Sequence, residues 1–370
     1  MHHQHGLQAD RGAGFEQALP VAGGNRRGNE QAHGPWCDLG IPRIGEHGEE
    51  GLLQGDVREK SRVQARRSRA AFANPRFTKS KPGVFALPIL SAACGATVQS
   101  FHPHKDRPPM RWIQFSEPDS GAMHHGILDD DDRVHAVRGL PWMDPERTGQ
   151  VHRLADVKVE VPLIPRTFYA AGLNYVTHIR QYAAETGTQA VVPQQADIGY
   201  RAINALVAHG EDVVIPSDAR QIEYEGELVV VIGKRARNLS PDEALGCVFG
   251  YTIGNDVSER LWQKSDRTFW RAKNADTFKP MGPWVDTDFD LAKAETTVSV
   301  NGAVTTRFAS SAMLFDIPTF ISRMSRYLTL HPGDVIWMGT DGKSPRIVAG
   351  DVVEVAITGL GALRNRFVAE

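Results

Sequence analysis

A pair of glutamates at the start of a strand-like run limits the fold more than any other feature of the sequence. Residues 227–233 (ELVVVIG) are apolar and rich in β-branched side chains, which predicts a strand with a buried middle. Glu225 and Glu227 lie two residues apart, so both carboxylates of such a strand face the same side. Two carboxylates that enter an apolar surface repel each other, and without a cation the pKa of at least one would rise.

A divalent ion with oxygen ligands would remove this repulsion. Asp256 follows a second strand-like run, residues 248–255, and could supply a third oxygen. Glu225, Glu227 and Asp256, with open positions for water and substrate, suit Mg²⁺, or else Mn²⁺ or Ca²⁺. Glu223 shares the face but precedes the apolar run, so we leave it outside the predicted site. On spacing alone, a solvated strand end remains the alternative.

Composition excludes several classes of protein. The 370 residues are 41% hydrophobic and 23% charged, which is typical of a soluble globular protein and excludes a wholly disordered or multi-span membrane protein. A net charge of −2 produces no strong electrostatic attraction to nucleic acid. The 3 cysteines lie far apart, which excludes a disulfide scaffold and a cysteine-rich zinc site. We expect a cytoplasmic protein with neither a nucleic-acid nor a membrane partner.

The first 109 residues have a different sequence pattern from the rest of the chain. They lack sustained apolar periodicity, and no tract in them can bury enough apolar surface to offset its ordering entropy. We expect a disordered extension, or translated upstream sequence before a start at Met110, that folding and turnover do not require. The alternative is a targeting segment, including a lipoprotein-like signal around Ser91-Ala92-Ala93-Cys94, but that run is internal.

Short strands dominate the remainder. Residues 110–162 predict a small N-terminal β domain, with strands at 112–115, 123–128 and 134–137. Residues 163–370 predict a larger domain, with strands at 168–173, 227–233, 248–255, 335–338 and 352–357, and helices at 175–185, after Ser240, at 257–265 and at 316–327. Asn301-Gly302 predicts a type I′ hairpin. Without a glycine-rich phosphate loop or a regular βαβ rhythm, a mixed, β-rich α+β fold is favoured over a parallel Rossmann sheet.

Several motifs of the larger domain occur in a recognisable order. They are Gly172-Leu173-Asn174-Tyr175-Val176-Thr177-His178, Tyr224-Glu225-Gly226-Glu227-Leu228, Gly254-Asn255-Asp256, Lys273, Gly282-Pro283, Pro332-Gly333-Asp334 and Gly339-Thr340. Over residues 165–368 this set resembles the fumarylacetoacetate hydrolase family, in its bacterial branch of acylpyruvases, 2-oxo-acid hydratases and oxaloacetate-type decarboxylases. The resemblance implies a small N-terminal β domain followed in sequence by a β-roll catalytic domain. It also implies a homodimer.

The resemblance also implies a role for each site residue. Glu225, Glu227 and Asp256 would hold Mg²⁺ or a similar ion. Lys273 matches the active-site lysine, and His178 matches the histidine that activates water from a short lid helix. The positions that would contact substrate are Arg260, Gln263, Thr277 and Thr340.

These roles suit one reaction best. A 2-oxo acid chelates a metal through its carboxylate and keto oxygens, and cleavage of the neighbouring C–C bond leaves an enolate that a Lewis acid stabilises. We therefore expect a metal-dependent hydrolase that cleaves a C–C bond of a 2,4-dioxo acid of the fumarylacetoacetate or acylpyruvate type. The alternatives are an oxaloacetate-type decarboxylase, a 2-oxo-acid hydratase or isomerase of aromatic catabolism, and a metal-binding protein without enzymatic activity.

Two positions depart from the family pattern. Gln181 stands three residues after His178, where single-domain relatives usually have a glutamate that would raise the basicity of the imidazole. Glu185 lies two helical turns from His178 and is another candidate for that carboxylate. Arg201-Ala202 replaces a Lys-Pro segment, which puts one further substrate contact in doubt. The long connection from 185 to 199 is expected to belong to the lid.

Overall fold

Strands make up most of the chain that the computed structural model describes, residues 109–370 apart from the side chains of Glu185 and Thr186. The predictions for the first 108 residues, and the one for the Glu185 carboxylate, lie outside the described residues. All described residues belong to one unit. Its strands are β1 (Arg111–Ser116), β2 (Met123–Leu128), β3 (Arg133–Arg138), β4 (Glu146–Arg153), β5 (Lys158–Val159), β6 (Phe168–Ala171), β7 (Ile198–Tyr200), β8 (Leu206–Val207), β9 (Asp212–Ile215), β10 (Ile222–Glu223), β11 (Gly226–Ile232), β12 (Val248–Asn255), β13 (Ser258–Glu259), β14 (Lys279–Asp286), β15 (Glu295–Val300), β16 (Ala303–Ala309), β17 (Val335–Trp337), β18 (Val352–Ile357) and β19 (Gly361–Ala369).

Helices are few and short among the described residues. The α-helices are α1 (Val176–Thr186), α2 (Pro241–Ala244), α3 (Arg260–Ser265) and α4 (Ile317–Tyr327). Single 3₁₀ turns occur at Leu154–Asp156, Ile203–Ala205, Leu245–Cys247, Leu291–Lys293 and Ser310–Ala312. No described helix has the length and apolar character needed to span a membrane.

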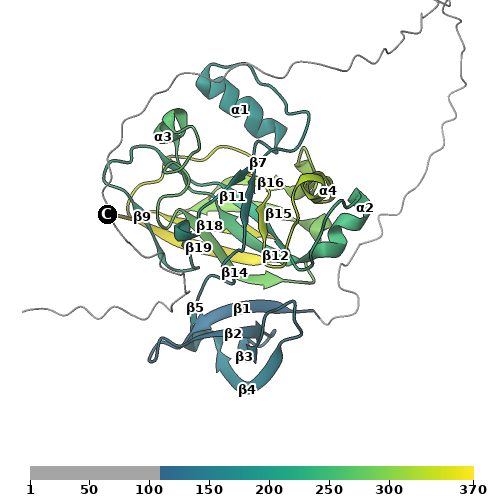
Figure 1. Ribbon diagram of the computed structural model, residues 1–370. Helices are drawn as coiled ribbons and strands as arrows, with labels where there is room; N and C mark the ends of the chain where they lie inside the picture. Colours follow the sequence, from purple (N-terminus) through teal and green to yellow (C-terminus); the bar gives the residue numbers. More distant parts are fainter. Residues whose placement is uncertain (1–108) are drawn as a thin grey trace, which may run out of the picture. The chain divides into compact units, whose positions relative to one another are not determined.

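Two sheets form the body of the fold (Figure 1). A 12-stranded sheet runs in the order β4-β3-β2-β1-β14-β12-β11-β17-β6-β7, with β5 and β8 added at β1 and β14. A 5-stranded sheet has the order β16-β15-β18-β19-β9, and β10 pairs with β13. The β17–β6, β14–β8 and β19–β9 pairs are parallel and the other pairs antiparallel, so the predicted mixed, β-rich fold is confirmed.

Strand β11 is the centre of this arrangement because both of its faces are buried. Leu228 and Val230 pack into the cluster that includes Val355 of the 5-stranded sheet. Val229 and Val231 belong to a second cluster on the opposite face. A full set of apolar neighbours on both faces fixes the register of β11, since a slip of one residue would exchange its two faces.

The small N-terminal β domain is continuous with the long sheet. Its strands β1–β4 form an antiparallel meander, drawn in blue in Figure 1. Trp112 of β1 pairs with Val285 of β14 and lies in the same apolar cluster as Val229 and Val231. Its indole N–H donates to the carbonyl of Pro162 at 3.2 Å. Trp112 therefore ties the meander to the strand that carries the glutamates.

Local signals in the sequence predicted several elements correctly. Ser240 and Glu243 form the capping box at α2, and the Asp316 side chain accepts a hydrogen bond from the Thr319 N–H at the start of α4. Asn301 and Gly302 both have positive φ (52° and 81°), as a type I′ hairpin requires.

The predicted helix at 257–265 was wrong at its start. Ser258 and Glu259 instead pair with β10, so α3 begins only at Arg260. The buried Glu259 carboxylate accepts hydrogen bonds from the N–H groups of Gln221 and Trp262. These hydrogen bonds hold residues 258–259 as the end of a strand instead of the first turn of a helix. They depend on residues distant in the sequence, which helical periodicity cannot predict.

Trp112 should be among the most stabilising side chains of the meander, since it is only 1% exposed. We expect Trp112→Ala to lower the free energy of unfolding by about 3–5 kcal/mol, the usual cost of a large cavity in a core. Trp270, 66% exposed, provides the matched control, and its replacement by Ala should cost only about 0.5 kcal/mol. Urea unfolding of both variants measures the difference; equal losses would contradict the packing described here.

Candidate metal centre and substrate pocket

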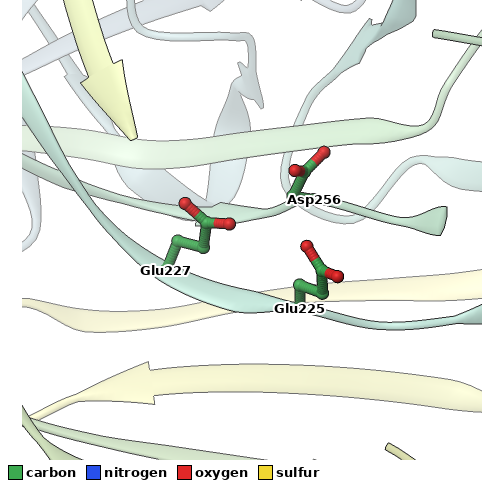
Figure 2. Close-up of side chains that lie close together, drawn as sticks. All are labelled: Glu225, Glu227 and Asp256. Carbon is green, nitrogen blue, oxygen red and sulfur yellow. The ribbon is translucent and has the colours of Figure 1, made fainter. Parts of the chain in front are cut away.

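Three buried carboxylates converge where β11 begins and β12 ends. In the β11–β12 ladder Glu227 pairs with Gly254, and the Asp256 N–H donates to the Glu225 carbonyl at 2.8 Å. Figure 2 shows the carboxylates of Glu225, Glu227 and Asp256 pointing toward a common space. One oxygen from each lies within 4.8 Å of the others, and the three residues are 6%, 2% and 1% exposed. They are not a solvated strand end.

Two of the three carboxylates are compensated by predicted site residues. Lys273 Nζ lies 2.6 Å from Glu225 Oε2 and 3.0 Å from Asp256 Oδ2. The Arg260 guanidinium lies 2.7 Å from Glu225 Oε1. Burial would raise the pKa of Glu225, but Lys273 and Arg260 outweigh burial and lower that pKa to about 2. Lys273 is itself buried, unlike a solvated loop lysine.

Asp256 is held by two further cations that the sequence did not identify as site residues. The Arg201 guanidinium, at the end of β7, donates to Asp256 Oδ2 at 2.8 Å. Lys279 Nζ, fully buried, lies 2.7 Å from Asp256 Oδ1. Burial opposes ionisation of Asp256, but Arg201, Lys273 and Lys279 lower its pKa well below the usual value. The replaced Lys-Pro segment was the only signal that pointed to Arg201.

Among the described residues, none forms an ion pair with Glu227 comparable to those of Glu225 and Asp256. Its Oε2 accepts a hydrogen bond from the Gly339 N–H at 2.8 Å. Burial, with the neighbouring charges of Asp256 and Glu225, raises the pKa of Glu227 to about 8. An all-oxygen set of three buried carboxylates, one of them uncompensated, fits a hard divalent cation.

Glu223 lies outside the cluster of three carboxylates but lines the neighbouring pocket. Arg260 Nε donates to Glu223 Oε2 at 2.7 Å, and Arg260 Nη1 donates to the Gln263 amide oxygen at 2.9 Å. The structure therefore brings Arg260 and Gln263 together on α3, with Glu223 of β10 facing them.

His178 lies on α1 and faces the loop that follows β17. Its Nδ1 lies 3.2 Å from the carbonyl oxygen of Gly342. Because a carbonyl only accepts, Nδ1 carries the proton and Nε2 is left as the acceptor. A backbone carbonyl thus orients the ring.

A pocket of about 220 Å³ is connected to the three carboxylates through Arg260, which lines the pocket and contacts Glu225. His178, Arg260, Gln263 and Thr340 line it. Thr277 does not: its hydroxyl accepts a hydrogen bond from the Val214 N–H at 2.8 Å, and it borders a separate depression next to Asp212 and Arg366. The structure brings together every predicted site residue except Thr277.

Comparison with known proteins places this geometry in a family. Residues 167–368 match the family described as fumarylacetoacetate (FAA) hydrolase C-terminal, and residues 110–162 match the one described as Rv2993c-like, N-terminal. Protein Rv2993c of Mycobacterium tuberculosis is 37% identical over 61% of this chain and 84% of its own length. A 2,4-didehydro-3-deoxy-L-rhamnonate hydrolase of Sphingomonas sp. is 33% identical over 70% and 95%. An oxaloacetate tautomerase of Bacillus subtilis is 34% identical over 66% and 86%.

Solved structures agree with these relatives. A 5-carboxymethyl-2-hydroxymuconate delta-isomerase from Mycobacterium smegmatis superposes with a TM-score of 0.64 at 34% identity, over 70% of this chain and 100% of that one. A maleylpyruvate hydrolase from Sphingobium sp. SYK-6, in complex with manganese(II) and pyruvate, gives 0.56 at 26% identity over 70% and 99%. The chain belongs to the fumarylacetoacetate hydrolase family, with an Rv2993c-like N-terminal domain.

Proposed function

We propose that this family member is a divalent-metal-dependent hydrolase that cleaves a C–C bond of a 2,4-dioxo acid. The observation that carries the proposal is the buried triad of Glu225, Glu227 and Asp256, whose partner Arg260 also lines a pocket with His178. A relative named as a hydrolase of a 2,4-didehydro-3-deoxy acid, matched over 95% of its length, supports this reaction class.

The three carboxylates would hold Mg²⁺ or Mn²⁺. When bound, the ion would supply Lewis acidity to the oxygens of a 2-oxo acid. The manganese(II) and pyruvate of the neighbouring maleylpyruvate hydrolase support the choice of metal and of ligand class. Lys273 and Arg260 add positive charge at the place where a substrate carboxylate and a developing enolate would need it.

His178 would act as the general base. Its Nε2, left as the acceptor by the Nδ1–Gly342 contact, can take a proton from a water molecule that attacks the C4 carbonyl carbon. The oxygen–C4 bond forms and the C3–C4 bond breaks, and its electron pair remains on C3, which then takes a proton. The products are a carboxylic acid and pyruvate. Gln263 and Thr340, which line the pocket, would bind the substrate beyond C4.

An oxaloacetate-type decarboxylase, or an isomerase of aromatic catabolism, is the second candidate. Relatives at similar identity carry these names: a 4-hydroxyphenylacetate degradation bifunctional isomerase/decarboxylase of Salmonella dublin at 35%, and the oxaloacetate tautomerase at 34%. Decarboxylation would use the carboxylate triad and Lys273 but needs no activated water, so the role of His178 separates it from hydrolysis.

The first test removes the uncompensated carboxylate. Glu227→Gln should weaken Mn²⁺ binding by at least about 10²-fold and abolish turnover, whereas Glu146→Gln, on the exposed strand β4, should change neither. Since burial and the neighbouring carboxylates raise the pKa of Glu227 to about 8, a cation that binds there competes with a proton. Metal affinity should therefore rise with pH up to about 8. Calorimetry in two buffers of different ionisation enthalpy measures the Mn²⁺ affinity and the proton released on binding. Unchanged metal binding in Glu227→Gln would contradict the proposed metal site.

The second test separates hydrolysis from decarboxylation. His178→Ala should slow hydrolysis of an acylpyruvate by roughly 10²–10⁴, the range for a positioned general base. Decarboxylation of oxaloacetate by the same variant should fall far less, because it needs no activated water. Steady-state kinetics of both reactions decide the matter. Equal losses would mean that His178 positions substrate instead of accepting a proton.

The third test concerns assembly. Family membership favours a homodimer, so light scattering should give about twice the chain mass of 40.7 kDa over a range of protein concentrations. A mass of one chain at every concentration would contradict this assignment.

A further inference from the structure

The loop that follows β17 contacts both the three carboxylates and the histidine. At its start the Gly339 N–H donates to Glu227 Oε2 at 2.8 Å. A few residues later the Gly342 carbonyl accepts from His178 Nδ1 at 3.2 Å. Thr340, between these two contacts, lines the pocket. The position of this loop therefore decides how the imidazole is oriented.

Tyr224, which directly precedes the first of the three carboxylates, holds this loop at two points. It is buried, at 3% exposed. Its backbone N–H donates to Ser344 Oγ at 3.1 Å. Its phenol oxygen lies 2.7 Å from Thr306 Oγ1, and that hydroxyl donates to the Lys343 carbonyl at 3.1 Å. The main chain and the side chain of one residue thus fix two consecutive residues of the loop, next to the carbonyl that orients the imidazole.

Thr306 also supports the Gly342 peptide by direct packing. A Cβ added at Gly342 would collide with Thr306 Cγ2, so the two residues are in close contact. On the other side, the Asp341 carboxylate accepts from the Gly342 N–H at 2.8 Å. With the peptide held from both sides, its carbonyl cannot turn away from His178 while Thr306 stays in place.

The neighbouring Thr305 contacts the same phenol but not the loop. Its Oγ1 also lies 2.7 Å from the phenol oxygen, and its hydroxyl donates to the Val298 carbonyl of β15 at 3.1 Å. Each threonine hydroxyl spends its one proton on a carbonyl, so both can only accept from Tyr224. The two threonines therefore share one phenol proton and differ in where their own protons go.

We propose that Tyr224 is a positioning residue for the general base His178. Through Thr306 it holds the Gly342 carbonyl against Nδ1 of the imidazole, so that Nε2 stays the proton acceptor. This inference rests on the proposed role of His178 and extends it, because it connects the base to the strand that carries the carboxylates. An imidazole released from this contact would keep its place but could present a protonated nitrogen to water.

The test uses variants that each remove one hydroxyl and keep the shape of the side chain: Tyr224→Phe, Thr306→Val, and Thr305→Val as the matched control. With Mn²⁺ and an acylpyruvate, the first two should each lower kcat for hydrolysis by about tenfold and leave KM within about twofold. Thr305→Val should leave kcat within about twofold. Tyr224→Phe should cause no further loss in the His178→Ala background, where the positioned group is absent.

The tautomer of His178 provides a measurement that does not depend on turnover. In the full chain labelled with nitrogen-15 histidine, the signals of this ring are those that His178→Ala removes. At a pH that keeps imidazoles neutral, Nδ1 should show the chemical shift of a protonated nitrogen and Nε2 that of an unprotonated one. Tyr224→Phe and Thr306→Val should move the two shifts toward each other, and Thr305→Val should not.

The outcomes separate this inference from the proposed function. If Tyr224→Phe leaves kcat and the tautomer unchanged, or slows the His178→Ala variant as much as the unaltered chain, the positioning role is overturned and the hydrolase assignment stands. If Thr305→Val acts as strongly as Thr306→Val, the connection through the loop is wrong. If the unaltered chain hydrolyses no acylpyruvate, the proposed function fails, and the chemical shifts alone decide whether Tyr224 orients the ring.

Discussion

The burial of three carboxylates in an apolar sheet is the constraint on which the rest of the site depends. Like charges this close and this far from water are strongly unfavourable unless cations offset them. Four cationic side chains surround them: Lys273 and Arg260 at Glu225, and Arg201 and Lys279, with Lys273, at Asp256. They come from the residue after β7, from α3, from the loop that follows α3 and from β14, so the whole domain has to fold before the carboxylates can be accommodated.

Neighbouring cations offset the charges of the three carboxylates unequally, and this difference matters for the chemistry of the site. The pKa values of Glu225 and Asp256 are lowered, whereas that of Glu227 is raised to about 8. A site that needed only structural stability would gain from neutralising all three. Leaving one carboxyl without a counter-ion keeps a place where a divalent cation lowers the energy of the folded chain, which is how metal binding and folding become coupled.

Local patterns predicted much of the fold, and long-range pairing accounts for what was missed. The continuous apolar, β-branched run of residues 227–233 predicted β11, and cap and turn residues predicted α4 and the β15–β16 hairpin. Strand β14 was not predicted, because Pro280, Gly282 and Pro283 make its sequence resemble a turn. Arg201 could not be assigned, because it meets Asp256 across 55 positions of sequence. Periodicity carries no information about such contacts.

The His178–Gly342 contact explains why residue 181 can differ from the family pattern. A carboxylate at 181 would orient the imidazole, but here the Gly342 carbonyl already does so. Residue 342 has to be glycine, because its φ is +78° and a Cβ there would collide with Thr306 Cγ2. Negative charge near the ring is supplied by the centre itself, since His178 and Glu225 interact electrostatically. Residue 181 is therefore not needed to orient the histidine.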